Sequence, residues 1–128
     1  MNILLDTHAF LWFIAGCNEL SDKARELIED ENNRILLSAG SLWEMAIKVS
    51  LKKLTLVEPY ETLIPDQLAL NCVEILGITV AHTTQLVNLP FHHRDPFDRL
   101  IISQALEEHI PVISVDDSFD QYDVTRIW

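Results

Sequence analysis

Four acidic residues each stand at the edge of an apolar run, and their types and positions suggest metal chemistry. They are Asp6 in NILLDTHAF, Glu44 in SLWEMAIK, Asp98 in RDPFDRLII and Asp116 in PVISVDD. Acids at the carboxyl ends of parallel strands, or in the first turn of a helix, lie at the edge of an α/β core where ligands bind. Four carboxylates gathered there repel one another unless cations are present. The sequence therefore predicts a site for a divalent metal ion.

Asp6 and Glu44 also fit ordinary structural roles. Asp6 follows strand-like residues and precedes a helix, where it or Thr7 would be the N-cap that accepts from free amide groups. Ser41 and Glu44 have the spacing of a capping box, and Glu44 and Lys48 form an i, i+4 pair worth about 0.2–0.5 kcal/mol. The immediate neighbours of Glu44 are apolar, however, and a buried carboxylate needs partners. The apolar neighbours therefore favour a functional role for Glu44.

The acids later in the chain have similar explanations. Asp95 precedes Pro96 and is expected to be a helix N-cap, because proline at the first helical position loses no hydrogen bond. Asp98 lies one turn in, where the helix dipole favours a negative charge, and Arg99 is a neighbouring counter-charge. Asp116 follows a strand and could be a turn residue. The four acids nevertheless fall on separate elements at one edge of the expected sheet, and a shared role explains this joint placement.

Hydrophobic periodicity predicts strands that alternate with helices. No hairpin signature separates the apolar runs, which favours a parallel α/β sheet of four to five strands in a single domain, residues 1–128. Gly16 is a helix stop after the first helix. The expected strands are 2–6, 34–38, 73–79 and 111–115 with a short edge strand near the C-terminus, and the expected helices lie within 7–16, 20–33, 39–54, 59–72, 81–89 and 96–109.

Composition indicates an ordinary globular domain with an acidic surface. The formal net charge is −11, which disfavours nucleic-acid binding, although a site that holds divalent cations reverses the local field. No run approaches the about 20 apolar residues of a membrane span. No export signal is evident, so we expect a cytoplasmic protein without membrane association in which Cys17 and Cys72 are reduced core residues.

The strings around the four acids resemble those of the PIN-domain ribonucleases, specifically the VapC-type toxins of bacterial toxin–antitoxin pairs. The matching strings are LLDTHAFLW, SLWEMAIKVSLKKL, HHRDPFDRLIISQA and VISVDDSFDQY, and they span almost the whole chain in the family's order. HHRDPFDRL is the most specific of them. Gly40 and Ser103 stand where alanine is commoner in the family, and both bear on packing. The resemblance implies a parallel sheet with helices on both faces.

The resemblance also implies an activity and a set of site residues. Asp6, Glu44, Asp98 and Asp116 resemble the family's acidic quartet, which binds one or two Mg²⁺ or Mn²⁺ ions for hydrolysis of RNA phosphodiester bonds. Asp6 and Asp98 are expected to be the most direct ligands, and Glu44 and Asp116 to complete the pocket or orient water. The residues expected to support this set are Thr7, Ser114, Arg99 and Asp95, the last as a cap, a supporting group or an additional ligand.

Partners follow from the same resemblance. It implies an RNA substrate, a cognate VapB-like antitoxin that blocks the site, and a homodimer. Candidate phosphate contacts are Lys48, Lys52, Lys53, Arg94 and Arg99, whereas the loop residues His92 and His93 are expected to be simply exposed. An exposed apolar patch around Trp12, Phe13 or Trp43 would serve either protein contact.

Three alternative functions are considered. A receiver-type phosphoacceptor domain needs an acidic pair after the first strand and a lysine after the last, but only Asp6 follows the first strand and no lysine follows Lys53. A haloacid-dehalogenase-like phosphatase needs a second aspartate two residues after the first, where His8 stands. A catalytically silent PIN-fold binding module, whose acidic pocket receives a basic segment of a partner, remains open on the sequence alone.

Overall fold

The computed structural model describes all 128 residues and contains one five-stranded parallel sheet. The strand order is β3-β2-β1-β4-β5, with β1 at the centre. The strands are β1 (Asn2–Leu5), β2 (Arg34–Ser38), β3 (Glu74–Leu76), β4 (Val112–Ile113) and β5 (Arg126–Ile127). The helices are α1 (Thr7–Ile14), α2 (Asp22–Glu29), α3 (Ala39–Ser50), α4 (Tyr60–Leu70), α5 (Val80–Val87) and α6 (Pro96–Glu108), with a 3₁₀ helix η1 (Asp117–Gln121).

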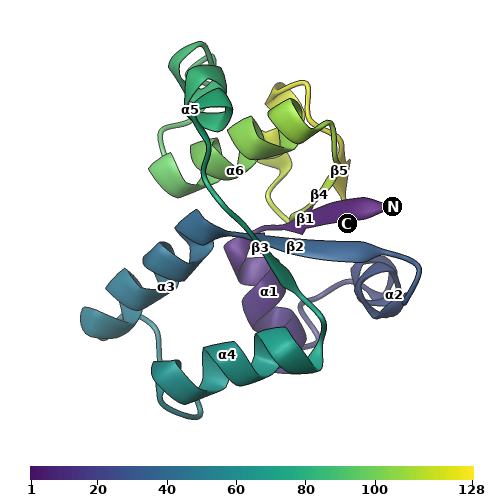
Figure 1. Cartoon of the computed structure of the whole chain (residues 1–128), viewed down its shortest axis with the longest axis vertical. Helices are drawn as coiled ribbons and strands as arrows, with labels where there is room; N and C mark the ends of the chain where they lie inside the picture. The colour runs from purple at the N-terminus through teal and green to yellow at the C-terminus, as the bar shows by residue number, and fades with distance from the viewer.

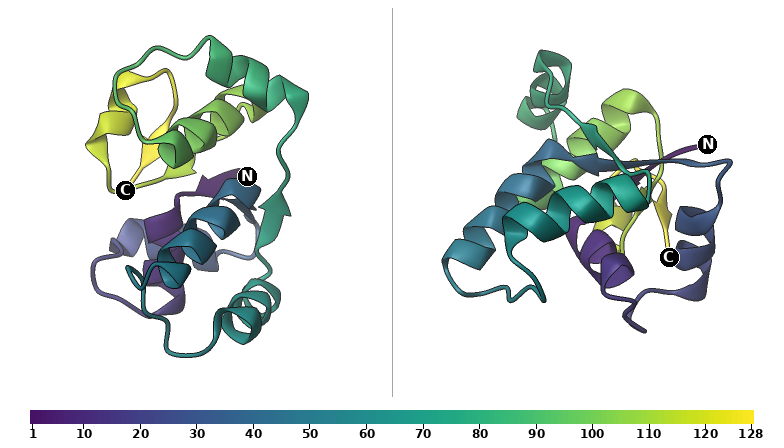
Figure 2. Two further views of the ribbon diagram at one scale, coloured as in Figure 1. Left: turned by 90° about the vertical axis from the view of Figure 1, so that its left-hand side faces the viewer. Right: turned by 60° about the horizontal axis from the view of Figure 1, so that its bottom comes forward.

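Helices cover both faces of the sheet, as Figures 1 and 2 show. The central strand β1, buried apart from Asn2, divides the core, because its successive side chains point to opposite faces. Ile3 and Leu5 pack with residues of α1 to α4, whereas Leu4 packs with residues of α6 and with Phe119. The fold class expected from the sequence, a parallel sheet of four to five strands with helices on both faces, is confirmed.

Several elements are shorter than expected. The third strand has three residues instead of the run 73–79, and the helix expected over 39–54 ends at Ser50. Lys52 adopts a left-handed backbone conformation with φ of 59°, which a continuing α-helix does not allow. Helix α2 stops at Glu29 rather than at the Asn pair. These differences lie away from the acidic residues.

Two local sequence patterns predicted the start of α6 and the end of α1 correctly. Asp95 is the N-cap of α6 and its Oδ1 accepts from the N–H groups of Phe97 and Asp98 at 2.9 and 3.1 Å. Pro96 occupies the first turn of the helix. Gly16 takes φ of 65° just after α1, a conformation that glycine adopts without steric cost.

Gly40 lets α3 and α6 approach each other closely. A Cβ atom at this position would overlap the side chain of Leu100, so the alanine that is commoner in the resembling family would require Leu100 to move. Ser103, the other departure, is fully buried and its hydroxyl donates to the carbonyl of Arg99 at 2.8 Å. Both departures therefore concern the packing of α6.

The cysteines do not lie in the core. Both thiols are free, as expected, but Cys17 is half-buried and Cys72 is exposed at a left-handed turn. The prediction of two core cysteines was wrong because both follow the ends of helices, where the chain turns at the surface. None of the helices combines the length and the apolar character needed to cross a lipid bilayer.

Candidate functional site

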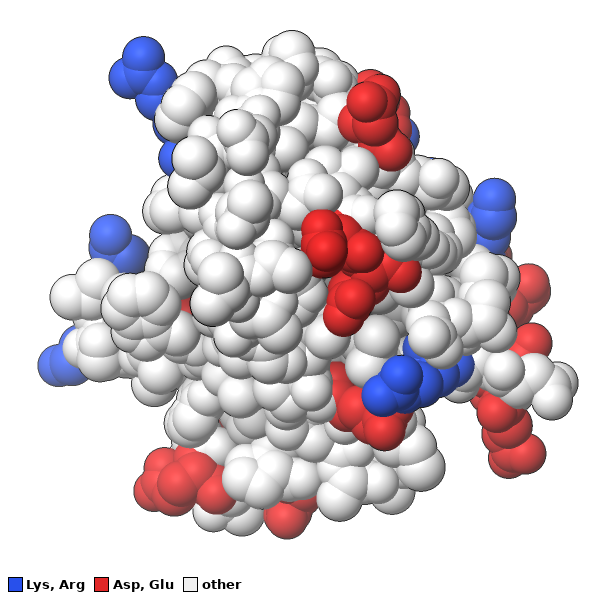
Figure 3. Space-filling view, turned by 45° about the horizontal axis from the view of Figure 1, so that its top comes forward, with Lys and Arg blue, Asp and Glu red and all other residues white.

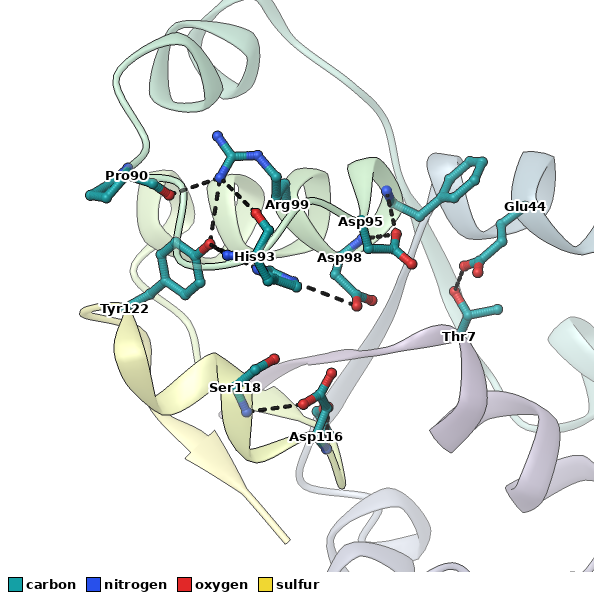
Figure 4. Close-up of polar contacts among 12 residues, drawn as sticks. Thr7, Glu44, Pro90, His93, Asp95, Asp98, Arg99, Asp116, Ser118 and Tyr122 are labelled. Atoms are coloured by element: carbon teal, nitrogen blue, oxygen red, sulfur yellow. Dashed lines mark hydrogen bonds and ion pairs between the residues drawn. The ribbon is translucent and has the colours of Figure 1, made fainter.

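The sheet brings the four acids of the sequence analysis to one edge. Asp6 directly follows β1 and Asp116 follows β4, and these neighbouring strands are parallel, with Leu5 opposite Ile113. Glu44 comes from α3 and Asp98 from the first turn of α6. Figure 4 shows that the side chains of Glu44, Asp98 and Asp116 extend from three different segments of the chain.

Asp6 is both a helix cap and a member of the acidic group. Its Oδ1 accepts from the N–H of Ala9 at 2.7 Å, and the residue is only 5 % exposed. Burial raises the pKa of Asp6, although hydrogen bonding by Ser114 and Ala9 and the charge of His8 partly offset this. The structural and the functional interpretation therefore apply to the same side chain, because the cap uses one carboxylate oxygen.

Glu44 is held by two partners at the base of the group. Its Oε1 accepts from the Thr7 hydroxyl at 2.6 Å and its Oε2 pairs with Lys48 Nζ at 2.8 Å. The expected i, i+4 pair is therefore present, and Thr7 contacts an acid as expected. The capping box of Ser41 and Glu44 is absent, because the N-cap of α3 is Ser38, three residues earlier. Ser41 Oγ instead lies 2.9 Å from Thr7 Oγ1.

Asp116 and Ser114 form the turn after β4. Asp116 accepts from the N–H of Ser118 at 2.9 Å and thereby caps η1. The N–H of Asp116 in turn donates to Ser114 Oγ at 3.1 Å. Ser114 is fully buried and also hydrogen-bonds Asp6, so it links the acids that follow β1 and β4.

Asp98 has a strongly raised pKa. Its pKa is raised to about 7, first by burial and then by the negative charges of Asp95, Asp6, Glu44 and Asp116. No lysine or arginine forms an ion pair with it, and the nearest basic group is His93, whose Nε2 lies 3.6 Å from Oδ2. Lys48 is thus the only lysine or arginine paired with one of the four acids. The repulsion expected from their positions in the sequence is present in the folded chain.

Arg99 does not act as the counter-charge of Asp98. Its guanidinium is buried and points the other way, toward the loop before α6, where Nη1 donates to the carbonyl of Pro90 at 2.8 Å and Nη2 to that of Leu89 at 3.1 Å. The ring of Phe91 stacks over it at 3.9 Å. The predictions that Arg99 supports the acids by its charge and contacts phosphate were wrong, since the loop carbonyls need this donor.

Two residues near the acids were missed or misjudged from the sequence. His93 is expected to be exposed, but its side chain is 17 % exposed and its Nδ1 lies 2.8 Å from the hydroxyl of Tyr122. Tyr122 carries no motif of its own in the sequence. Figure 4 shows both side chains beside Arg99 and Asp98. Only their proximity in the fold identifies them, since 29 residues separate them in the chain.

The donor set fits a hard divalent cation. All four acids offer carboxylate oxygens, which Mg²⁺ and Mn²⁺ prefer. No three acidic, histidine or cysteine side chains are close enough to hold one ion together in this conformation. Mg²⁺ keeps several water ligands and needs only one or two direct carboxylates, so this spacing suits an ion bound partly through water. Figure 3 shows one face of the molecule, with several acidic groups across it and basic side chains mainly toward its outline.

The raised pKa of Asp98 gives a pH dependence of stability with a definite sign. The folded protein keeps this proton up to about pH 7, whereas the unfolded chain releases it near pH 3.8. Between these values the folded state binds the extra proton, so the free energy of unfolding falls as the pH rises. We expect the melting temperature in EDTA to decrease from about pH 5 to about pH 7.5, and the Asp98→Asn variant to show a shallower decrease. Equal slopes for the two proteins would contradict the raised pKa of Asp98.

Comparison with known proteins identifies the family. The family model for the PIN domain matches residues 3–124, so the chain belongs to the PIN-domain family. Residues 3–124 include all four acids, strands β2 to β4 and all of β1 except Asn2.

Individual relatives are similar over different lengths. The chain is 39 % identical over 62 residues to the protein named Ribonuclease VapC16 of Mycobacterium tuberculosis, a match that spans 48 % of this chain and 44 % of that protein. The chain thus matches less than half the length of this curated relative. The structure of VapBC2 from Rickettsia felis, bound to a DNA fragment from its promoter, superimposes with a TM-score of 0.74 at 20 % identity, covering 99 % of this chain and 98 % of that one. VapBC-1 from nontypeable Haemophilus influenzae gives 0.66 at 18 % identity, with 99 % and 97 % covered.

Proposed function

We propose that this protein is a metal-dependent endoribonuclease, acting as the toxin of a type II toxin–antitoxin pair. The observation that carries the proposal is the group of four carboxylates at one edge of the sheet, whose mutual repulsion and burial raise the pKa of Asp98 to about 7. Such a group is costly unless it binds cations. The similarity to a protein named Ribonuclease VapC16 supports the choice of RNA as substrate, and the fold shared with toxin–antitoxin complexes supports the role as a toxin.

The residues of the site divide into two kinds under this proposal. Asp6 and Asp98 are the direct ligands, since both have raised pKa values that a bound cation would reverse. Both oxygens of Glu44 are held, by Thr7 and Lys48, so Glu44 completes the pocket. Asp116 uses Oδ1 to cap η1 and has Oδ2 left to orient water. A bound Mg²⁺ or Mn²⁺ would lower the pKa of the attacking water and offset the charge of the phosphate.

Substrate phosphates need positive charge from the protein as well as from the metal. Lys52, Lys53 and Arg94 are exposed and form no ion pair, so they are free to contact the RNA backbone. Lys48 already neutralises Glu44, and Arg99 is buried, so neither is free for this role. With a net charge of −11, binding of RNA should depend strongly on divalent cations.

The purified protein should cleave structured RNA in Mn²⁺ or Mg²⁺ and lose all cleavage in EDTA. Metal binding is measured separately as a rise in melting temperature, because the cation binds the folded state alone and relieves the repulsion among the carboxylates. A rise without cleavage would favour the catalytically silent binding module. No rise and no cleavage would contradict the metal site itself.

The antitoxin partner is proposed to bind an apolar cavity beside the acids. This cavity of about 540 Å³ lies between α1, α3 and the chain that follows α3. It adjoins the acidic group through Thr7 and Lys48, and Trp12 and the 93 % exposed Val57 contribute apolar surface. A segment with apolar side chains and a basic residue would fill it and reach the carboxylates.

Homodimerisation remains a proposal with a different candidate surface. Trp43 is 67 % exposed and packs edge-on against Phe97, with 6.0 Å between the ring centroids. Of the three residues expected to form an apolar patch, Trp43 is the exposed one, whereas Trp12 and Phe13 are half-buried. A second copy of the chain that covers Trp43 would bring two acidic sites near one interface.

A further inference from the structure

His93 carries an unpaired nitrogen beside the acids. Its Nε2 is buried and has no hydrogen-bond partner, and it lies 3.6 Å from Oδ2 of Asp98. A buried polar atom of this kind needs an explanation, because most such atoms are paired. The other ring nitrogen, Nδ1, lies within hydrogen-bond distance of the Tyr122 hydroxyl (Figure 4).

The contacts of the Tyr122 hydroxyl decide which ring nitrogen of His93 carries the proton. This hydroxyl accepts from the backbone N–H of His93 at 3.2 Å and from Arg99 Nη1 at 3.4 Å, which fills both of its lone pairs. Its own proton then has one acceptor within reach, Nδ1 of His93 at 2.8 Å. A neutral imidazole whose Nδ1 accepts carries its proton on Nε2.

We propose that His93 is a positioning residue of this site, which donates its Nε2–H to the Asp98 carboxylate while Tyr122 fixes the tautomer. This inference rests on the proposed function only for its catalytic consequence. Closing the 3.6 Å separation to a hydrogen bond needs only a small rotation of the Asp98 side chain, which is 26 % exposed. The donated bond engages Oδ2 and leaves Oδ1 of Asp98 to face the other acids.

The same geometry excludes His93 as a metal ligand. A ligating imidazole needs a lone pair on the nitrogen that faces the ion, and Nε2 carries a proton here. His93 thus acts through Asp98. Arg99 completes the arrangement, since it anchors Tyr122 and the carbonyl of Pro90 and so holds the loop that carries His93. Groups that orient a ligating carboxylate commonly change metal affinity or activity by about 10–100-fold when removed.

The first test observes the metal-free protein and needs no activity. Long-range ¹H–¹⁵N NMR of the His93 ring should show the proton on Nε2, and the Tyr122→Phe variant should show a mixture of tautomers. The ¹³Cγ resonance of Asp98 should shift in His93→Asn but hardly in His93→Gln. A proton on Nδ1 in the wild-type protein would overturn the proposal. So would an Asp98 resonance that stays unchanged in both His93→Asn and His93→Gln.

The second test separates positioning from structural support. The amide nitrogen of Gln can occupy the place of Nε2, whereas that of Asn reaches only the place of Nδ1, so His93→Gln should retain most of the Mn²⁺ affinity and turnover. His93→Asn should weaken Mn²⁺ binding by about 10-fold or more and lower kcat, with KM for RNA little changed. His109→Gln is the control and should behave as the wild type, because this exposed histidine caps the end of α6 opposite to Asp98.

The outcomes distinguish this inference from the proposed function. Equal losses in His93→Gln and His93→Asn would overturn positioning even if the wild-type protein cleaves RNA. A wild-type protein that neither binds Mn²⁺ nor cleaves RNA would contradict the proposed function. In that case the NMR results on the tautomer and on Asp98 still decide whether His93 orients this carboxylate.

Discussion

Replacing Asp98 with Asn is expected to reduce RNA cleavage by about 100-fold or more, because metal-based charge stabilisation is worth several kcal/mol and about 1.4 kcal/mol changes a rate tenfold. The substitution keeps the size of the side chain and removes one negative charge from the group. It also removes the repulsion from Asp95, Asp6, Glu44 and Asp116. The metal-free variant should therefore melt at a higher temperature than the wild type above pH 7.

Lost activity together with gained stability distinguishes the removal of a site carboxylate from misfolding. A variant that simply misfolds loses both, so cleavage rates and melting temperatures are measured on the same preparations. Asp117→Asn is the matched control, since Asp117 is an exposed acid next to Asp116 and its loss should leave cleavage unchanged. Addition of Mn²⁺ should raise the melting temperature of the wild type more than that of Asp98→Asn. Full cleavage by Asp98→Asn would identify a contaminating nuclease or a site elsewhere.

The second large effect is expected in stability, at Arg99. The Arg99→Leu substitution removes two short hydrogen bonds from a charged donor, to the carbonyls of Pro90 and Leu89. Each such bond contributes about 1.5–3 kcal/mol, so we expect the free energy of unfolding to fall by about 3 kcal/mol. The loop before α6 and Tyr122 lose their common anchor.

Urea unfolding monitored by circular dichroism measures this loss. Arg94→Leu is the control, because Arg94 lies in the same loop but is exposed and forms no hydrogen bond or ion pair. Its unfolding free energy should stay within about 0.5 kcal/mol of the wild type. A loss below about 1 kcal/mol in Arg99→Leu would mean that water replaces the guanidinium at these carbonyls.

The sequence predicted the elements well where the signals are local. Asp95 and Pro96 begin α6, Gly16 follows α1, and the apolar runs at β1 and β2 are fully buried apart from their first residues. Caps and turns depend on backbone groups only a few residues away, so short strings contain their physical cause. The capping box at Ser41 was wrong because two serines stood near the helix start and the spacing alone could not choose between them.

What the sequence by itself determined is the position of the four acids at the ends of strands and in helical turns, together with the parallel fold that gathers them. What only the tertiary structure decided is which neighbours they meet. Arg99 turns from Asp98 to the loop carbonyls, and His93 is buried against Tyr122 rather than exposed. The raised pKa of Asp98 likewise depends on burial and on charges from distant segments. Such contacts join residues far apart in the chain, and no local pattern specifies them.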